Sequence, residues 1–128
     1  MKETFIPVTK DEDNEQPIPT IWRPLIHSIV DRLVDHDYGI LGGLSGVLPV
    51  TEETSDQIKS YIDDYGEDLS RLPERTWDSS VCIWMETHWD ILVDLWTEGE
   101  GRSDLVLGAK VFETNSQYSI EVDMVYVP

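Results

Sequence analysis

Acidic side chains are the residues of this chain with the most obvious chemistry, and they gather at two places. The first cluster is Asp63, Asp64, Glu67 and Asp68, and the second is Glu98 and Glu100. Carboxylates this close together attract cations and the lysine and arginine side chains of other proteins. We therefore predict that these six acids are partner-binding residues. The alternative is that they serve solubility alone.

Two further groups could carry chemistry, one as a metal site and one as a nucleophile. Glu86, His88 and Asp90 would share one face of a regular strand, where they could bind a divalent ion. Cys82 and His88 could form a nucleophile and base pair if the fold brought them together. An outward polar strand face explains the first group, and a small packed side chain explains Cys82. We expect no catalytic residue, no metal and no cofactor, and hence no enzyme.

The charge of the whole chain narrows the class of partner. Its 128 residues include 26 acids and nine lysines and arginines, for a formal net charge of −17. Such a chain repels nucleic acid and anionic membranes and attracts basic proteins. It has no apolar run of the roughly 20 residues that a membrane helix needs, and no apolar stretch typical of a signal peptide. With a single cysteine and no possible internal disulfide, we expect a cytoplasmic protein.

The elements that must position these side chains begin with an arm and a helix. Residues 1–19 are expected to form a flexible arm or an edge strand, with Thr4–Val8 as the strand candidate. Residues 20–128 are expected to form a single α+β domain. Apolar residues at helical spacing predict a first helix from about Thr20 to Gly39.

A second helix is expected to begin after Thr51 or Ser55, where acids follow and favour the first turn. The sequence leaves two possible ends. If the helix ends at Gly66, the first acidic cluster lies at its C-terminus, where carboxylates oppose the helix dipole. If it ends near Ile62, the same acids are loop residues.

The C-terminal half alternates apolar and polar residues, which is typical of strands with one buried face. Period two in four runs predicts an antiparallel sheet of three to four strands. With two helices before it, this sheet predicts an α+β fold with both helices on one face, a cystatin-like arrangement being one option. The first two runs share a phase, so residues 81–96 form either one bent strand or two. The runs are Val81–Met85, Trp89–Leu95, Leu105–Val111 and Tyr118–Tyr126.

A hairpin is predicted where Thr97–Asp104 connects two of these runs. Gly99 and Gly101 can adopt positive φ without a steric cost. Arg102 has acids on both sides and is expected to pair with one of them. Its candidate partners are Asp94, Glu100 and Asp104.

The stretch WDILVDLWTEGEGRSDLVL (Trp89–Leu107) resembles a family of small bacterial proteins of unknown function. That family reads approximately Trp-x-Val-x-Val-Asp-Leu-Trp-Thr, then acids, then Gly-Arg-Ser-Asp-Leu-Thr-Leu. The match is close over Asp94–Thr97 and Gly101–Leu105. It departs at Gly99, where the family usually has an acid, and at Val106, where it usually has threonine. The resemblance implies no activity, but the small acidic members resemble the immunity proteins encoded beside bacterial toxins in size and character.

Two functions from different classes fit these patterns. The favoured hypothesis is a bacterial immunity protein that binds a cognate toxin, most simply a basic nuclease, and occludes its active site. Its acids would then replace nucleic acid phosphates against the toxin's lysines and arginines, and exposed aromatic residues would anchor the contact. The alternative is a cystatin-like small-ligand-binding protein or enzyme, which needs an apolar pocket with convergent polar groups.

Overall fold

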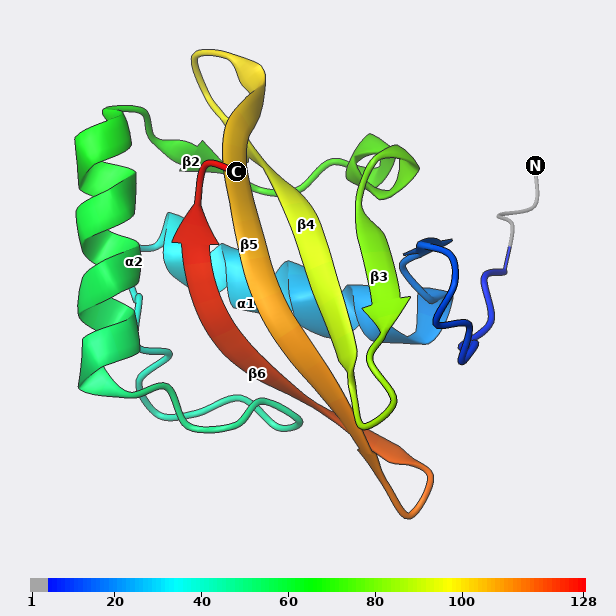
Figure 1. Ribbon diagram of the computed structural model, residues 1–128. Helices are drawn as coiled ribbons and strands as arrows, with labels where there is room; N and C mark the ends of the chain where they lie inside the picture. Colours follow the sequence, from blue (N-terminus) through cyan, green and yellow to red (C-terminus); the bar gives the residue numbers. More distant parts are fainter. Residues whose placement is uncertain (1–4) are drawn as a thin grey trace.

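The structure is a computed structural model that describes residues 5–128 (Figure 1). Within this range the chain has two α-helices and a six-stranded antiparallel sheet, which confirms the predicted α+β class. Two short 3₁₀ helices, Thr20–Trp22 and Glu74–Asp78, join these elements. The helices and strands are β1 (Gln16–Pro17), α1 (Arg23–Val34), α2 (Glu52–Tyr65), β2 (Leu69–Ser70), β3 (Val81–Trp84), β4 (Trp89–Thr97), β5 (Gly101–Thr114) and β6 (Gln117–Tyr126).

The sheet has the strand order β1-β3-β4-β5-β6, and β2 pairs with the C-terminal end of β4. Residues 81–96, which could have been one bent strand, form two: β3 and β4 pair from Val81↔Leu92 to Trp84↔Trp89. The sheet has more strands than the three to four predicted. The additional ones, β1 and β2, have two residues each, and so short a segment shows no alternation.

The first helix is shorter than predicted. A 3₁₀ turn, Thr20–Trp22, leads into α1, and Pro24 lies in the first turn, where its missing N–H costs no hydrogen bond. The helix ends at Val34 and not near Gly39, because the chain turns at His36, whose φ is 63°. In Figure 1 α1 crosses behind the sheet and covers one of its faces. Its buried residues are Ile26, Ile29, Val30 and Leu33.

The second helix begins after Thr51, one of the two predicted starts. The Thr51 hydroxyl accepts a hydrogen bond from the Thr54 N–H at 3.1 Å, which caps the helix. Gly66 ends the helix in the left-handed conformation, with φ of 84°. The helix therefore continues past Ile62, and the first two acids of the first cluster lie in its last turn. Neither helix in the described range is long and apolar enough to cross a membrane.

The helix α2 lies beside the edge strand β6, whereas the prediction had both helices on one face of the sheet. The Gln57 side chain donates to the Val125 carbonyl at 2.7 Å and accepts from the Val125 N–H at 3.2 Å. Farther along β6, the Ile120 N–H donates to the Gly46 carbonyl at 2.8 Å, and the Leu48 N–H donates to the Ile120 carbonyl at 2.9 Å. The outer edge of β6 is thus bonded to a glutamine side chain and to the loop before α2.

Aromatic side chains fill the space between α1 and the sheet. Trp89 of β4 is fully buried, with its ring centroid 5.2 Å from that of Trp22 and 4.6 Å from that of Trp84. Tyr118 of β6 packs edge-on against Trp22 at 5.5 Å. These contacts make the helix-facing side of the sheet a packed core.

Residues 5–19 lie against the domain. The edge strand of this arm is Gln16–Pro17, which pairs with β3, and not Thr4–Val8. The first residue of that predicted strand lies outside the described residues, and the others have no strand structure. Ile6 and Thr20 exchange two hydrogen bonds, of 2.7 and 2.9 Å. The described part of the arm is therefore bonded to the rest of the fold.

The strand β6 departs from the alternation predicted for it. Gly108 and Ala109 are consecutive in β5, but their partners in β6 are Met124 and Val122, so β6 has one extra residue. Such a bulge reverses which face the following side chains take. Val125 is consequently buried, while Met124 is 39% exposed.

Candidate partner-binding site

The β4–β5 turn, at the upper end of the sheet in Figure 1, is tighter than the predicted loop Thr97–Asp104. Only residues 98–100 lie outside the two strands. The Thr97 hydroxyl accepts a hydrogen bond from the Glu100 N–H at 3.1 Å, which closes the turn. Both glutamates of the second acidic cluster are therefore at the tip of the hairpin.

The two glycines of this hairpin have different roles. Gly101 has the predicted positive φ, at 76°, whereas the φ of Gly99 is not positive. A Cβ at Gly99 would lie 2.7 Å from the Oε1 atom of Glu67, closer than any contact that real Cβ atoms make. The Glu67 carboxylate thus approaches the hairpin at Gly99, although this flexible side chain could move aside for a larger residue there.

The two-residue strand β2 brings the two acidic clusters together. It pairs with the last two residues of β4, and the Glu98 N–H donates to the Asp68 carbonyl at 2.9 Å. The Tyr65 hydroxyl, at the end of α2, accepts from the Asp104 N–H at 3.1 Å. All the predicted acids therefore lie at one end of the molecule. We call this the acidic end, and it comprises Asp63, Asp64, Glu67, Asp68, Glu98 and Glu100.

Bases compensate the acidic end poorly. All its acids are exposed except Glu67, which is half-buried. Among the described residues only one of them, Asp63, forms an ion pair, with Lys59 at 2.7 Å. The last turn of α2 has no basic residue, so the negative end of the helix dipole adds to the same potential. The acidic end can therefore attract a cationic surface over several ångströms.

Tyr65 connects the two halves of the acidic end. The Asp104 N–H lowers the pKa of Tyr65, but a hydrogen bond with Glu100, burial and the nearby carboxylates together raise it above its usual value. The phenol therefore stays protonated at neutral pH and can bridge the helix and the hairpin.

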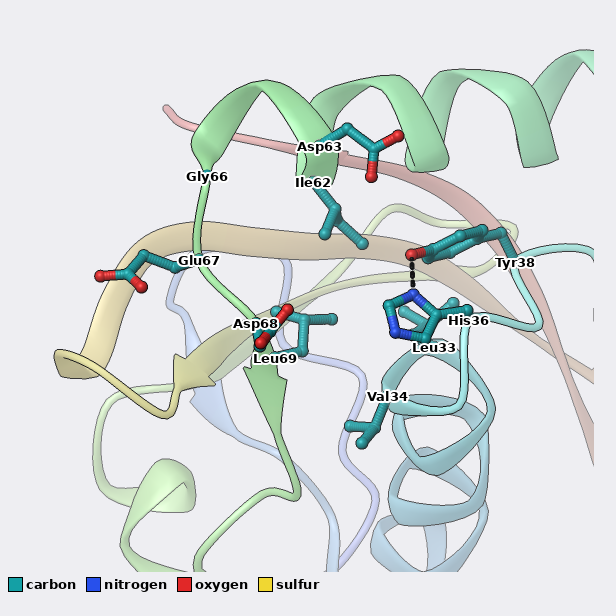
Figure 2. Close-up of a pocket in the computed structure, with 10 residues that line it drawn as sticks. All are labelled: Leu33, Val34, His36, Tyr38, Ile62, Asp63, Gly66, Glu67, Asp68 and Leu69. Atoms are coloured by element: carbon teal, nitrogen blue, oxygen red, sulfur yellow. Dashed lines mark hydrogen bonds between the residues drawn. The ribbon is translucent and has the colours of Figure 1, made fainter.

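A pocket of about 210 Å³ opens between the C-terminal ends of α1 and α2 (Figure 2). On one side the His36 ring accepts or donates a hydrogen bond to the Tyr38 hydroxyl, with Nδ1 and Oη 2.7 Å apart. Figure 2 shows the Asp63 side chain on the same side of the pocket as Tyr38, while Glu67 points away toward the hairpin. The lining residues are Leu33, Val34, His36, Tyr38, Ile62, Asp63, Gly66, Glu67, Asp68 and Leu69.

The pKa of Tyr38 reflects the burial and the charges around this pocket. Its side chain is buried, and burial is the main reason that the pKa of Tyr38 is raised. The carboxylates of Asp63 and Asp68 raise it further, and Lys59 opposes them. A negative potential therefore extends from the rim to the phenol.

Ser103, from the stretch that resembles the bacterial family, has a structural role. Its hydroxyl donates to the Leu95 carbonyl at 2.8 Å and accepts from the Leu105 N–H at 3.1 Å. These bonds lie where the pairing of β4 with β5 shifts register, between Asp94 and Trp96. The serine thus satisfies backbone groups that the interrupted ladder leaves without partners.

The prediction that Arg102 pairs with a neighbouring acid is wrong. Arg102 is exposed and has no ion pair with any other described residue. One of its candidate partners, Asp94, accepts a hydrogen bond from the Ser79 hydroxyl. A different arginine, Arg75, lies over the Trp96 ring at 4.7 Å from its centroid. Arg102 is therefore free to act at the surface.

The candidate metal ligands do not form a regular strand face. Glu86 lies in the β3–β4 turn with φ of 73°, outside both strands. The two ring nitrogens of His88 contact Thr87 Oγ1 at 2.9 Å and Asp90 Oδ1 at 3.1 Å. Residues 5–128 contain no group of three side chains placed to hold a metal ion. This geometry gives no support to a metal site here.

Cys82 is buried and does not contact His88. Its Sγ lies 3.6 Å from the Pro17 carbonyl oxygen. Burial raises the pKa of Cys82 to about 11, so the thiol is protonated at neutral pH. Because the thiolate is the reactive form, this cysteine is not placed to act as a nucleophile.

Most of this fold belongs to a recognised protein family. Residues 30–128 match the domain of unknown function DUF7668, and the chain is therefore a member of that family. The matched region includes the whole acidic end. No curated protein and no solved structure matches the chain.

Three side chains of this region were not predicted to belong to a site: His36, Tyr38 and Tyr65. A tyrosine next to acids at the edge of an apolar stripe was the available signal, because its hydroxyl needs a polar partner when the ring packs.

Proposed function

We propose that this protein is an immunity protein that binds a basic protein toxin through its acidic end and neutralises it. The observation that supports this proposal most is the gathering of six acids from two distant segments, with one compensating base among the described residues. Like charges held together this way destabilise the free protein. A partner that supplies lysines and arginines would remove that repulsion on binding.

The proposed mechanism is steric occlusion aided by electrostatic steering. A nuclease active site is lined by basic residues that bind phosphates, and the exposed carboxylates would occupy those positions in their place. The carboxylates stand on a helix end and a hairpin that are hydrogen-bonded to each other, so little ordering is needed on binding. Tyr61 of α2, 38% exposed, could supply an aromatic anchor beside the acids.

The second candidate, a small-ligand-binding protein or enzyme of cystatin-like type, has less support. Such a function would use a cavity between the helix and the sheet. Trp22, Trp89 and Tyr118 fill that space.

The test measures association with the toxin encoded beside the gene, together with growth protection on co-expression. We expect neutralisation of the first acidic cluster to slow association by about tenfold or more at low salt, since steering of this kind changes on-rates by roughly 10 to 10³-fold. The difference should shrink as salt rises. The neutralised variant carries Asp63→Asn, Asp64→Asn, Glu67→Gln and Asp68→Asn.

A matched control separates the acidic end from net charge. The control variant removes four exposed acids whose side chains have no hydrogen bond or ion pair with other described residues: Asp13→Asn, Glu15→Gln, Glu53→Gln and Asp78→Asn. It should associate almost as fast as the natural chain. The proposal fails if no toxin binds, or if the two variants slow association equally.

A further inference from the structure

The pocket between the two helix ends is concave, whereas the rest of the acidic end is exposed surface. Leu33 and Ile62, which are almost wholly buried, and half-buried Val34 lie at its floor, while polar groups supply most of the lining that a ligand could touch. Its rim has two carboxylates, those of Asp63 and Asp68, and both are exposed. A ligand that fits must therefore have a cationic head, and its stem can contact the half-buried Val34.

Three independent features of this pocket favour a cation. The C-terminal ends of α1 and α2 both lie at it, and each carries the negative end of a helix dipole. Arg32, the basic residue in the last turn of α1, is bonded to Asp37, Leu41 and Gly43, so its charge is directed to the following loop. The Tyr38 hydroxyl has one described partner, the His36 ring, and a phenol oxygen can take part in further hydrogen bonds.

We propose that this pocket binds the side chain of an arginine from the basic partner. The inference rests on the proposed function for the source of the arginine, but the recognition chemistry belongs to the pocket. A guanidinium is planar and has five donors, which suits acceptors on opposite sides of a cavity better than the compact ammonium of lysine does. Asp63 and Asp68 accept from its N–H groups, and half-buried Val34 contacts its methylene stem. Lys59 pairs with Asp63 and turns aside or shares that carboxylate.

His36 lines the pocket in an unusual backbone conformation. It has φ of 63°, at the position after a helix where glycine is the usual residue. Residues with a Cβ rarely adopt this backbone conformation, although histidine does so more often than most. Its ring is the hydrogen-bond partner of Tyr38, which holds the phenol at the pocket. His36 is thus a positioning residue for the proposed arginine site.

The experiment needs no partner protein, so its result is independent of the toxin assay. The ¹⁵N-labelled full chain is titrated with N-acetyl-arginine methylamide, and amide shifts are followed by NMR. We expect saturable shifts at residues 36–38 and 66–69. The matched citrulline compound, which has the same shape without the charge, should leave these amides unchanged. The matched lysine compound should bind about tenfold more weakly, or about 1.4 kcal/mol.

Variants then test the two carboxylates. Asp63→Asn with Asp68→Asn should weaken arginine binding by about tenfold, whereas Asp13→Asn with Glu15→Gln, which removes the same charge elsewhere, should not. Equal shifts with citrulline, equal binding of lysine, or equal loss in both double variants would overturn the assignment. If the toxin binds but the pocket variants and the probe show no effect, this inference fails while the proposed function stands. If the probe binds here but no toxin does, only the proposed function fails.

Discussion

The two ends of the sheet differ in how far their acidic side chains are paired with basic ones. At the β3–β4 and β5–β6 turns, at the bottom of Figure 1, Lys10 pairs with Glu113 at 3.2 Å, and His88 lies 3.1 Å from Asp90. Lys10 also lies 5.2 Å from the Trp84 ring centroid. At the acidic end, by contrast, Lys59 is the one base of residues 5–128 that pairs with an acid of the cluster.

This difference shows that an acidic composition does not by itself identify a binding surface. Both ends contain carboxylates, but at the β3–β4 end Glu113 and Asp90 have basic or imidazole partners within the chain. Acids without a base partner occur elsewhere on the surface too, but β2 and the β4–β5 hairpin bring five of them together with Asp63 at one end. Carboxylates without a base partner within the chain are the ones whose charge is available to pair with the basic groups of another molecule.

The largest effect on stability is expected at the β3–β4 end of the sheet, which we call the packed end because Trp22, Trp84 and Trp89 pack together there. Trp89→Ala should lower the free energy of unfolding by about 3–5 kcal/mol, because it removes a fully buried ring from a cluster of aromatic side chains. Urea denaturation followed by circular dichroism measures this. Binding by the remaining folded protein should be unchanged. A loss below about 1 kcal/mol would show that this end is not the core that the contacts indicate.

A smaller effect of opposite sign is expected at the acidic end. The neutralised variant should be more stable than the natural chain at low salt by about 0.5 kcal/mol, since acids in the last turn of α2 oppose its dipole and repel one another. The gain should fall at high salt, where screening is strong. Unfolding midpoints at two salt concentrations would detect it. An unchanged or lower stability would mean that these acids are compensated after all.

The smallest expected effect concerns two acids near the packed end that lie beside each other, Glu12 and Glu86. A hydrogen bond with Glu86, together with repulsion between the two carboxyl groups, raises the pKa of Glu12 above 4.5. The folded chain therefore holds that proton more tightly than the unfolded chain does. The stability from this group is present below pH 4.5 and is lost as the pH rises through the raised pKa.

The test of this effect is Glu12→Gln, which cannot titrate. Relative to this variant, the natural chain should lose stability between pH 4.5 and neutral pH. Unfolding midpoints across that range provide the comparison. Two profiles that run parallel would show that Glu12 and Glu86 do not interact.

The local features of this fold could be predicted from the sequence. The α+β class, the cap at Thr51 and the stop at Gly66 each depend on a few neighbouring residues. The clusters at the acidic end were also visible, because the acids are adjacent in the sequence.

The assembly of the site could not be predicted. It depends on β2, whose two residues pair with β4 and show no pattern of their own. Likewise, the approach of the Glu67 carboxylate to Gly99 depends on the link between α2 and β2, while the sequence suggested only a turn. The bulge that buries Val125 follows from pairing with β5, and alternation alone pointed to Met124.

The bonding along β6 has a consequence for how the chain behaves when it is crowded. An exposed edge strand is a template on which another chain can add a strand, the first step to swapped dimers or fibrils. Here the Gln57 amide occupies both backbone groups of Val125, and Gly46 and Leu48 occupy those of Ile120. Two points on that edge are therefore closed to an incoming strand, which disfavours strand pairing between two copies of the chain there.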